Sequence, residues 1–255
     1  MLKEKRLMQI LEILKRDGEV EINTLARIFN VADITIRRDL DSLAKEQNIQ
    51  KTHGGALLIN EELNAEPPYE RRIAIHGDLK EKIANKALSL VKVGQKIYID
   101  SGTTTFYMAK NISNSYKNTV VTNGLNIASE IIRRHYINVL LIGGELTKNT
   151  LATRGALAEE LLQRFKFDAA FLGANSIGED GYLYIGNTSE TGIKNRVIQD
   201  AKETYILLDS SKFNKYNLIT YAHARDVAGI ITDNHIPKKT VEQLTEMGVN
   251  IIIAE

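Results

Sequence analysis

Hydroxyl-bearing residues crowd one short run in the middle of the chain. Ser101, Gly102, Thr103, Thr104 and Thr105 directly follow an apolar segment. Backbone N–H groups, hydroxyls and the start of a helix together favour the binding of a phosphate group. The run lacks the Gly-Lys-Ser/Thr of a nucleotide-binding loop, and a plain turn between a strand and a helix explains it equally well. It therefore indicates a candidate phosphate-binding loop and leaves the ligand open.

Small or polar residues also end the neighbouring predicted strands. Asp100 closes the segment 96–100, and later segments end at Thr122, Asn123, Gly143, Gly144 and Asn175. Because the carboxyl ends of parallel strands meet at one edge of a sheet, we expect these residues to line a shared ligand crevice.

Three charged residues extend this set. Glu190 and Lys194 lie one turn apart on a helix predicted over 188–201, and Lys212 follows a strand predicted over 204–209. Taken by themselves, Glu190 and Lys194 more readily indicate an ion pair on the helix surface. Their position after a strand end also fits a role in the same crevice.

The elements that position these residues alternate between strands and helices. A helix over 78–91 is expected to begin with a capping box of Asp78 and Glu81, and a long loop is expected between residues 174 and 188. Such alternation is typical of an α/β domain whose mostly parallel sheet is covered on both faces. The predicted strands are 96–100, 119–123, 138–143, 168–174, 204–209, 229–232 and 250–254, and the other predicted helices are 104–112, 125–134, 156–164, 188–201 and 238–247.

The first 60 residues follow a different pattern. Apolar spacing predicts helices over 3–17, 24–29 and 33–46, with Asn23 as the cap of the second helix and a tight turn at Asn30-Val31. Three short helices with such a turn are typical of a helix-turn-helix. Alternating residues after Glu46 and the turn residues Gly54-Gly55 predict a β-hairpin wing.

The third helix presents a polar face opposite its apolar stripe of Ile36, Leu40 and Leu43. Arginine suits guanine or a phosphate, so this face is predicted to enter a DNA major groove, with the wing against the neighbouring backbone. Ordinary solvated surface remains an alternative, since residues 1–60 hold ten Lys and Arg against nine Asp and Glu. The predicted contacts are Ile34, Thr35, Arg37, Arg38, Asp41, Ser42 and Lys45 on the helix and Lys51, Thr52 and His53 on the wing.

Composition narrows the classes of function. The 255 residues include no cysteine, and 33 Lys and Arg against 32 Asp and Glu give a formal charge of +1, which argues against a uniformly basic coat. The lack of cysteine excludes disulfides and thiolate chemistry, and the five scattered histidines predict no metal site. No segment reads as a signal peptide or a membrane span, so we expect a cytoplasmic protein without a membrane partner.

Two runs carry a family resemblance in the N-terminal segment. VADITIRRDLDSLAKE followed by KTHGGA resembles the winged helix-turn-helix of the DeoR family of bacterial transcriptional regulators. Ala32 stands where that family usually has serine, so Asp33 is expected to cap the third helix instead.

The resemblance extends over the rest of the chain. IDSGTTT, VTNGLNIA, LIGGEL, FDAAFLGA and LLDSSKF recur in order, as they do in the family's effector domain. It implies a DNA-binding domain over 1–58 and an effector and oligomerisation domain over 77–255, the latter similar in fold to ribose-5-phosphate isomerase. The segment 59–76 between them holds two of the three prolines and no strong periodicity, which predicts a linker. By the same resemblance, the 101–105 loop holds a sugar phosphate, and Asp100, Thr122, Asn123, Glu190, Lys194 and Lys212 surround the sugar.

The function implied is a homo-oligomeric repressor, dimer or tetramer, of a carbohydrate-use operon. It would bind operator DNA, respond to a phosphorylated sugar and need no cofactor. The alternative is a sugar-phosphate isomerase fused to a DNA-binding module, with Glu190 or Asp100 as the base.

Overall fold

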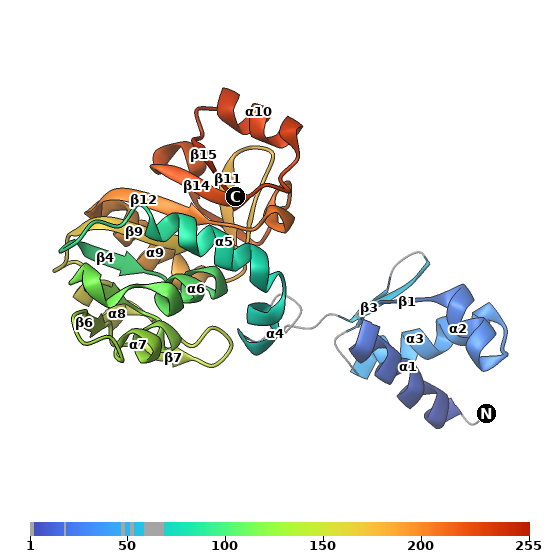
Figure 1. Cartoon of the computed structure of the whole chain (residues 1–255). Helices are drawn as coiled ribbons and strands as arrows, with labels where there is room; N and C mark the ends of the chain where they lie inside the picture. Colours follow the sequence, from blue (N-terminus) through green and yellow to red (C-terminus); the bar gives the residue numbers. More distant parts are fainter. Residues whose placement is uncertain (1–2, 18, 47–48, 52–53, 59–68) are drawn as a thin grey trace. The chain divides into compact units, whose positions relative to one another are not determined.

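The computed structural model describes residues 3–17, 19–46, 49–51, 54–58 and 69–255. The chain forms two compact units, Met1–Glu66 and Pro67–Glu255, which are described separately below. Figure 1 shows the elements of both units.

The N-terminal unit contains three helices and a small antiparallel sheet. The helices are α1 (Lys3–Asp17), α2 (Ile22–Phe29) and α3 (Asp33–Glu46). The strands are β1 (Glu19–Glu21), β2 (Ile49–Lys51) and β3 (Gly55–Leu58), and β3 lies between the other two. The helix-turn-helix and the wing predicted from the sequence are therefore both present.

The predicted apolar stripe forms the core of this unit. Ile36 and Leu40 of α3 are fully buried against Ile10 and Leu14 of α1. Asn30 has a left-handed conformation, with φ of 50°, and closes the turn between α2 and α3 through hydrogen bonds to the end of α2. Asparagine accepts this conformation at low cost, which explains why it stands at the turn.

Several local predictions were wrong in this unit. Helix α2 begins at Ile22, so Asn23 lies in its first turn and Glu21 precedes it. The carbonyl of Ala32 accepts the first hydrogen bonds of α3, which puts Asp33 inside the helix rather than at its cap. Gly55 opens a strand instead of a turn, and a Cβ there would lie 1.8 Å from the carbonyl oxygen of Val20. It must be glycine because β1 approaches too closely for a side chain.

A buried ion pair fixes α3 against α1. Arg6 Nε donates to Asp39 Oδ2 at 2.5 Å, and Arg6 Nη2 donates to Asp39 Oδ1 at 3.2 Å. The two side chains are 8% and 2% exposed. A guanidinium and a carboxylate that meet through two bonds hold a defined geometry, so this pair sets the angle of α3 on α1.

The larger unit is built on a seven-stranded, wholly parallel sheet with the order β15-β14-β12-β9-β4-β5-β6. Its strands are β4 (Lys96–Ile99), β5 (Thr119–Thr122), β6 (Asn138–Leu141), β9 (Phe167–Gly173), β12 (Ala201–Leu207), β14 (Gly229–Asp233) and β15 (Ile251–Ala254). The predicted α/β class and mostly parallel sheet are confirmed.

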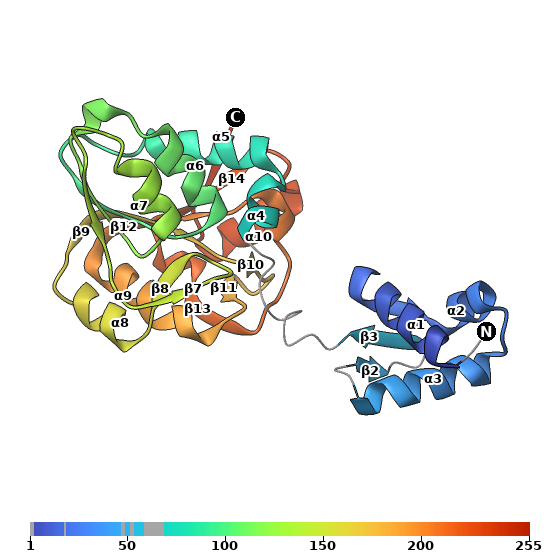
Figure 2. The same ribbon diagram turned by 90° about the horizontal axis from the view of Figure 1, so that it is seen from below.

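Helices cover both faces of this sheet, as Figure 2 shows. Helices α5 (Gly77–Leu88), α6 (Thr103–Asn111) and α7 (Leu125–Ile131) pack on one face in one apolar core. Helices α8 (Ala156–Leu162) and α9 (Thr191–Asp200) pack on the other, and α10 (Lys238–Glu246) joins the same second core through Leu244.

Two small sheets were not predicted. The region expected to be a long loop before residue 188 contains β10 (Ser176–Ile177) and β11 (Tyr182–Ile185), which pair with each other, and β11 also pairs with β13 (Ile219–His223). The hairpin of β7 (Glu145–Thr147) and β8 (Ala152–Arg154) follows β6. These strands are short and their partners are partly distant in sequence, so they leave little periodic signal.

The start of the larger unit also differs from expectation. Helix α4 (Tyr69–Ala74) occupies part of the predicted linker, and Tyr69 is buried with its ring edge-on to Phe106 at 6.1 Å. No capping box forms at α5, because His76 in a left-handed conformation precedes the helix without a side-chain cap. The domain limits 1–58, 59–76 and 77–255 stay predictions.

Replacement of Asp39 by asparagine is expected to destabilise the N-terminal unit by about 3 kcal/mol, because a buried guanidinium then faces a neutral partner. Urea unfolding followed by far-UV circular dichroism measures this change. The matched control is Glu12→Gln, an exposed carboxylate on α1, which should change stability by less than about 0.5 kcal/mol. Equal unfolding midpoints for Asp39→Asn and the unaltered protein would refute the role of the pair.

Candidate functional site

Helix α3 presents the predicted DNA-reading face to solvent. Ile34 is 56% exposed, Arg37, Arg38 and Asp41 are exposed, and Thr35 is half-buried. Ser42 is tied into the surface, since its hydroxyl donates to the carbonyl of Arg38 and accepts from Lys3 Nζ. Of the remaining predicted contacts, Lys45 and Lys51 are described only as backbone in α3 and β2, and Thr52 and His53 lie outside the described residues.

The second candidate site lies where the strand order of the large sheet reverses. Strand β4 is followed in the chain by β5 on one side, whereas β9, on its other side, is followed by β12. In open parallel sheets, ligands bind at the carboxyl ends of the two strands that flank such a reversal. Asp100 follows β4, and Gly173 ends β9, so both residues lie at this point.

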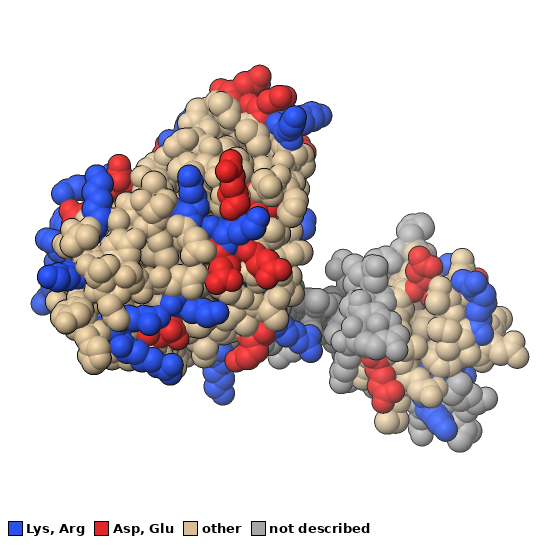
Figure 3. Space-filling view, in the orientation of Figure 1, with Lys and Arg blue, Asp and Glu red and all other residues tan. Residues whose placement is uncertain are grey.

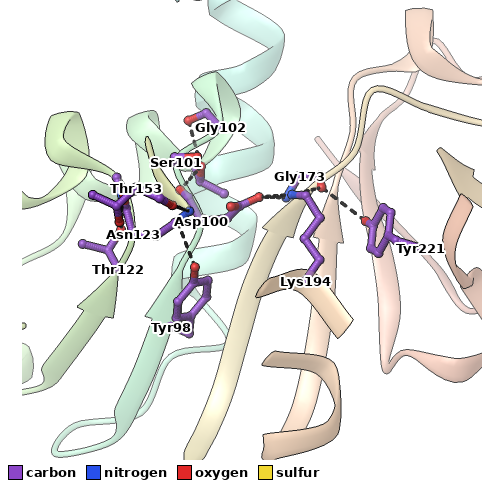
Figure 4. Close-up of polar contacts among 12 residues, drawn as sticks. Tyr98, Asp100, Ser101, Gly102, Thr122, Asn123, Thr153, Gly173, Lys194 and Tyr221 are labelled. Carbon is purple, nitrogen blue, oxygen red and sulfur yellow. Dashed lines mark hydrogen bonds and ion pairs between the residues drawn. The ribbon is translucent and has the colours of Figure 1, made fainter. Parts of the chain in front are cut away.

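A buried lysine joins these two strand ends. Lys194 Nζ of α9 donates to Asp100 Oδ2 at 2.5 Å and to the carbonyl oxygen of Gly173 at 2.9 Å. The amide of Gly173 donates to the same Asp100 oxygen at 2.9 Å. Tyr221 of β13 donates its hydroxyl to the Gly173 carbonyl, as Figure 4 shows.

The charge on Lys194 is secured by its neighbours. Burial by itself would lower the pKa of Lys194, but the carboxylates of Asp100 and Glu190 outweigh it and raise the pKa above that of an ordinary lysine. Lys194 therefore stays a cation, and only 4% of it is exposed. The alternative of an ion pair on the surface of the helix is wrong for Lys194. Glu190 is the last residue of a short 3-10 turn (Thr188–Glu190) and directly precedes α9, so it does not lie within the helix.

A second buried polar chain connects β4, β5 and the hairpin. The Tyr98 hydroxyl donates to Asn123 Oδ1 at 2.8 Å, and Asn123 Nδ2 donates to the carbonyl oxygen of Thr153 at 3.1 Å (Figure 4). The amide of Thr153 donates to the carbonyl oxygen of Asn123, and its hydroxyl donates to that of Ile142 at 2.6 Å. Asn123 is thus held in one orientation at the end of β5.

The hydroxyl-rich loop forms the start of α6. Gly102 precedes the helix, and Thr103 and Thr104, each 8% exposed, lie in its first turn. Thr105 is fully buried, and its hydroxyl donates to the carbonyls of Asp100 and Gly102. Thr105 therefore shapes the loop, whereas Ser101, Thr103 and Thr104 remain the candidates for contact with a phosphate.

The other predicted residues are more scattered. Thr122 is buried, and its hydroxyl accepts from the amide of Gly124. Asn175 is half-buried, and its backbone N–H donates to the backbone carbonyl of Tyr184. Gly143 and Gly144 are exposed where β6 leads into the hairpin. No contact ties these glycines to Asp100 or Lys194 among the residues that the structure describes.

Besides Tyr98, Thr153 and Tyr221, the sequence did not predict the site residues Lys80 and Asn126. Lys80 is 4% exposed and donates to the carbonyl of Arg72. Burial, partly offset by the carboxylate of Asp209 and aided by the charges of Lys212 and Arg72, lowers its pKa to about 8. Its signal was a lysine within the apolar stripe of α5. Asn126 donates to the carbonyl of Ser101, while its own buried Oδ1 accepts nothing from the described residues.

The surface charge of the larger unit is mixed, and the described residues offer neither a metal site nor a membrane-spanning helix. In Figure 3, Lys and Arg side chains alternate with Asp and Glu over the visible face of the larger unit, so no field of one sign covers that face. Among the described residues, no group of three or more His, Asp or Glu side chains is placed to hold a metal ion. The same residues contain no helix that is long and apolar enough to cross a membrane.

Family models match both units. The DeoR C terminal sensor domain matches residues 75–234, and the DeoR-like helix-turn-helix domain matches residues 6–62. This chain belongs to the DeoR family. The resemblance seen in the sequence is thereby confirmed, and this protein is a transcriptional regulator.

Relatives of the DeoR-family protein match over nearly their whole length. The lactose phosphotransferase system repressor of Lactococcus lactis is 32% identical over 96% of this chain and 97% of its own. The glycerol-3-phosphate regulon repressor of Escherichia coli is 30% identical over 95% of both chains. Among solved structures, ribose-5-phosphate isomerase A of Methanocaldococcus jannaschii is 22% identical over 54% of each chain, with a TM-score of 0.40.

The lowered pKa of Lys80 predicts a rise in stability with pH. Below pH 8 the folded protein bears the cost of a buried charge; between pH 8 and about 10 it loses this proton, whereas the unfolded chain, with a lysine pKa near 10.5, keeps it. The unfolded state then binds more protons, so the free energy of unfolding of the sensor unit should rise by about 1 kcal/mol per pH unit at most.

Urea unfolding at pH 7.5 and pH 9.5 measures this rise. The Lys80→Met variant should lose it, whereas Lys86→Met, an exposed lysine on the same helix, should keep it. A rise of the same size in Lys80→Met and in the unaltered protein would show that another group causes it.

Proposed function

We propose that this regulator represses a carbohydrate-use operon in the bacterial cytoplasm and that a phosphorylated sugar sets its affinity for operator DNA. The observation that carries the proposal is the buried pair of Asp100 and Lys194 at the strand reversal, together with the buried Asn123 at the end of the neighbouring strand β5. Buried polar groups are expensive to maintain, and a sensor domain has a reason to keep them where a polar ligand binds. The names of the two relatives, a lactose phosphotransferase system repressor and a glycerol-3-phosphate regulon repressor, support the same reading.

DNA recognition is assigned to α3 and the wing. Arg37 and Arg38 stand exposed on α3, and Ile34 offers an apolar surface to a thymine methyl group. One small module buries too little surface for tight specific binding, so two copies are expected to read paired half-sites. The regulator is therefore proposed to act as a homo-oligomer, dimer or tetramer.

The effector is assigned to the carboxyl edge of the large sheet. The start of α6 with Ser101, Thr103 and Thr104 suits a phosphate, and the cations Lys80 and Lys212 add positive charge at the ends of the strands. The free oxygen of Asn126 suits a sugar hydroxyl as donor. Glu190, close enough to influence Lys194, completes the polar surroundings.

Binding without turnover is proposed for this site. Asp100, one of the two candidate bases, receives hydrogen bonds from Lys194 and from the amide of Gly173, which engages it in holding two strand ends together. A ligand that binds two arrangements of the oligomer unequally changes DNA affinity with no chemical step. Incubation with sugar phosphates and analysis for a converted product tests the isomerase alternative.

Replacement of either α3 arginine should weaken specific DNA binding. The Arg37→Ala and Arg38→Ala variants are each expected to lose tenfold or more in affinity, since one good arginine contact to a base contributes about 1–3 kcal/mol. Fluorescence anisotropy on genomic fragments selected with the unaltered protein measures this at fixed salt. Arg164→Ala, an exposed arginine of the sensor unit, is the control and should bind normally. Unchanged affinity in both α3 variants would rule out α3 as the reading helix.

Loss of the loop hydroxyls should uncouple DNA binding from the effector. The double variant Thr103→Val and Thr104→Val keeps the shape of both side chains but removes two hydrogen-bonding groups from the first turn of α6. It should bind the operator as the unaltered protein does and require at least tenfold more effector for the same response. Glucose 6-phosphate, fructose 1-phosphate and glycerol 3-phosphate are the first probes. A response at the same concentration would place the phosphate elsewhere.

A further inference from the structure

The strand at one edge of the large sheet is unprotected. Strand β6 has the sequence Asn-Val-Leu-Leu, with Leu140 44% exposed and Leu141 42% exposed. Natural edge strands usually carry lysine, proline or a covering segment that prevents pairing with another chain. At the opposite edge, Ile251, Ile252 and Ile253 of β15 are only half-buried. The side chains of β6 are thus more exposed than those of β15 at the opposite edge.

The backbone of β6 offers hydrogen bonds in a definite register. The backbone amides of Asn138 and Ile142 donate to the carbonyls just before and at the end of β5. Because these groups alternate in direction along a parallel strand, the N–H and C=O groups of Val139 and Leu141 point away from the sheet. An antiparallel strand related by a two-fold axis can pair with these groups when Val139 of one copy meets Leu141 of the other. Leu140 then faces its own copy across the axis.

Apolar side chains extend this edge onto α8. Ile142 lies on the same face of β6 as Leu140 and packs in one core with Ala158 and Leu162 of α8. On that helix, Leu157 and Leu161 are one turn apart and are 74% and 37% exposed. A stable interface buries about 800 Å² per partner, more than one strand edge provides, and these leucines enlarge the apolar surface towards that size.

Charge along this edge is self-complementary. The exposed Arg133 precedes β6, and Glu145, which pairs with Arg154 at 3.2 Å but whose side chain is still 70% exposed, follows it. Antiparallel pairing brings the beginning of one strand beside the end of the other, so each basic end meets an acidic end. A surface that matches itself in this way is what a two-fold interface requires.

We propose that two copies of this chain associate through antiparallel pairing of their β6 strands, with Leu140 at the two-fold axis and α8 beside it. The two parallel sheets then form one continuous sheet of fourteen strands. The inference concerns the assembly and does not depend on which ligand the sensor site binds.

Sedimentation velocity of the full chain tests the interface. The unaltered protein should sediment as a dimer or larger assembly, and Leu140→Arg and Leu157→Glu should each weaken the association at least tenfold. Leu218→Glu changes a leucine that is 64% exposed elsewhere on the unit and should associate normally. A monomeric unaltered protein, or an oligomer that both β6–α8 variants leave intact, would overturn the proposal.

A cysteine trap tests the register. The chain has no cysteine, and residues that face each other in a pair without hydrogen bonds have Cα atoms about 4.5 Å apart, within the range of a disulfide. Mild oxidation of Leu140→Cys should therefore give a covalent dimer on a non-reducing gel, whereas Leu218→Cys should stay monomeric on the gel. Failure of Leu140→Cys to cross-link, in protein that circular dichroism shows to be folded, would refute this register.

Discussion

The ammonium of Lys194, buried between a carboxylate and a carbonyl, is the interaction on which the sensor edge depends. It joins the ends of β4 and β9, where the sheet reverses its order. A buried charge without its partner costs several kcal/mol, so Asp100 and Lys194 are obliged to stay together. Their mutual attraction thereby keeps polar groups at the carboxyl ends of β4 and β9, a buried region that apolar side chains would otherwise fill.

The polar side chains at this edge of the sheet fall into two groups: those that are hydrogen-bonded within the protein and those that are available to a ligand. Thr105, Thr122 and Asn123 use their polar atoms within the protein, which gives the strand ends a fixed shape. Thr103 lies in the first turn of α6 and Asn126 in the first turn of α7. The carboxamide oxygen of Asn126 has no partner among the described residues. A rigid frame around a few unengaged groups is the arrangement by which proteins bind small polar molecules selectively.

The sequence was informative where periodicity was strong and weak where partners lie far apart along the chain. The stripe of Ile36, Leu40 and Leu43 follows helical spacing and is buried as predicted. Asp100 was predicted from its place at a strand end, but its pairing with Lys194 joins residues 94 positions apart and has no local signature. Tyr221 belongs to the short strand β13, which pairs with β11. It was not predicted, because this pairing also joins segments that are distant in the sequence. Lys80 could have been found, because a charge within an apolar helical stripe needs an explanation.

Thr153 of the β7–β8 hairpin connects the end of β5 to the end of β6. It holds Asn123 at the effector edge through its amide and Ile142, just beyond β6, through its hydroxyl. A displacement of Asn123 must therefore either move Ile142 or break a buried hydrogen bond, and the second costs about 1–3 kcal/mol. Any free energy that couples the two ends of this connection acts in both directions. Subunits joined through β6 would then alter the affinity for the small molecule by the same factor by which the small molecule alters their joining.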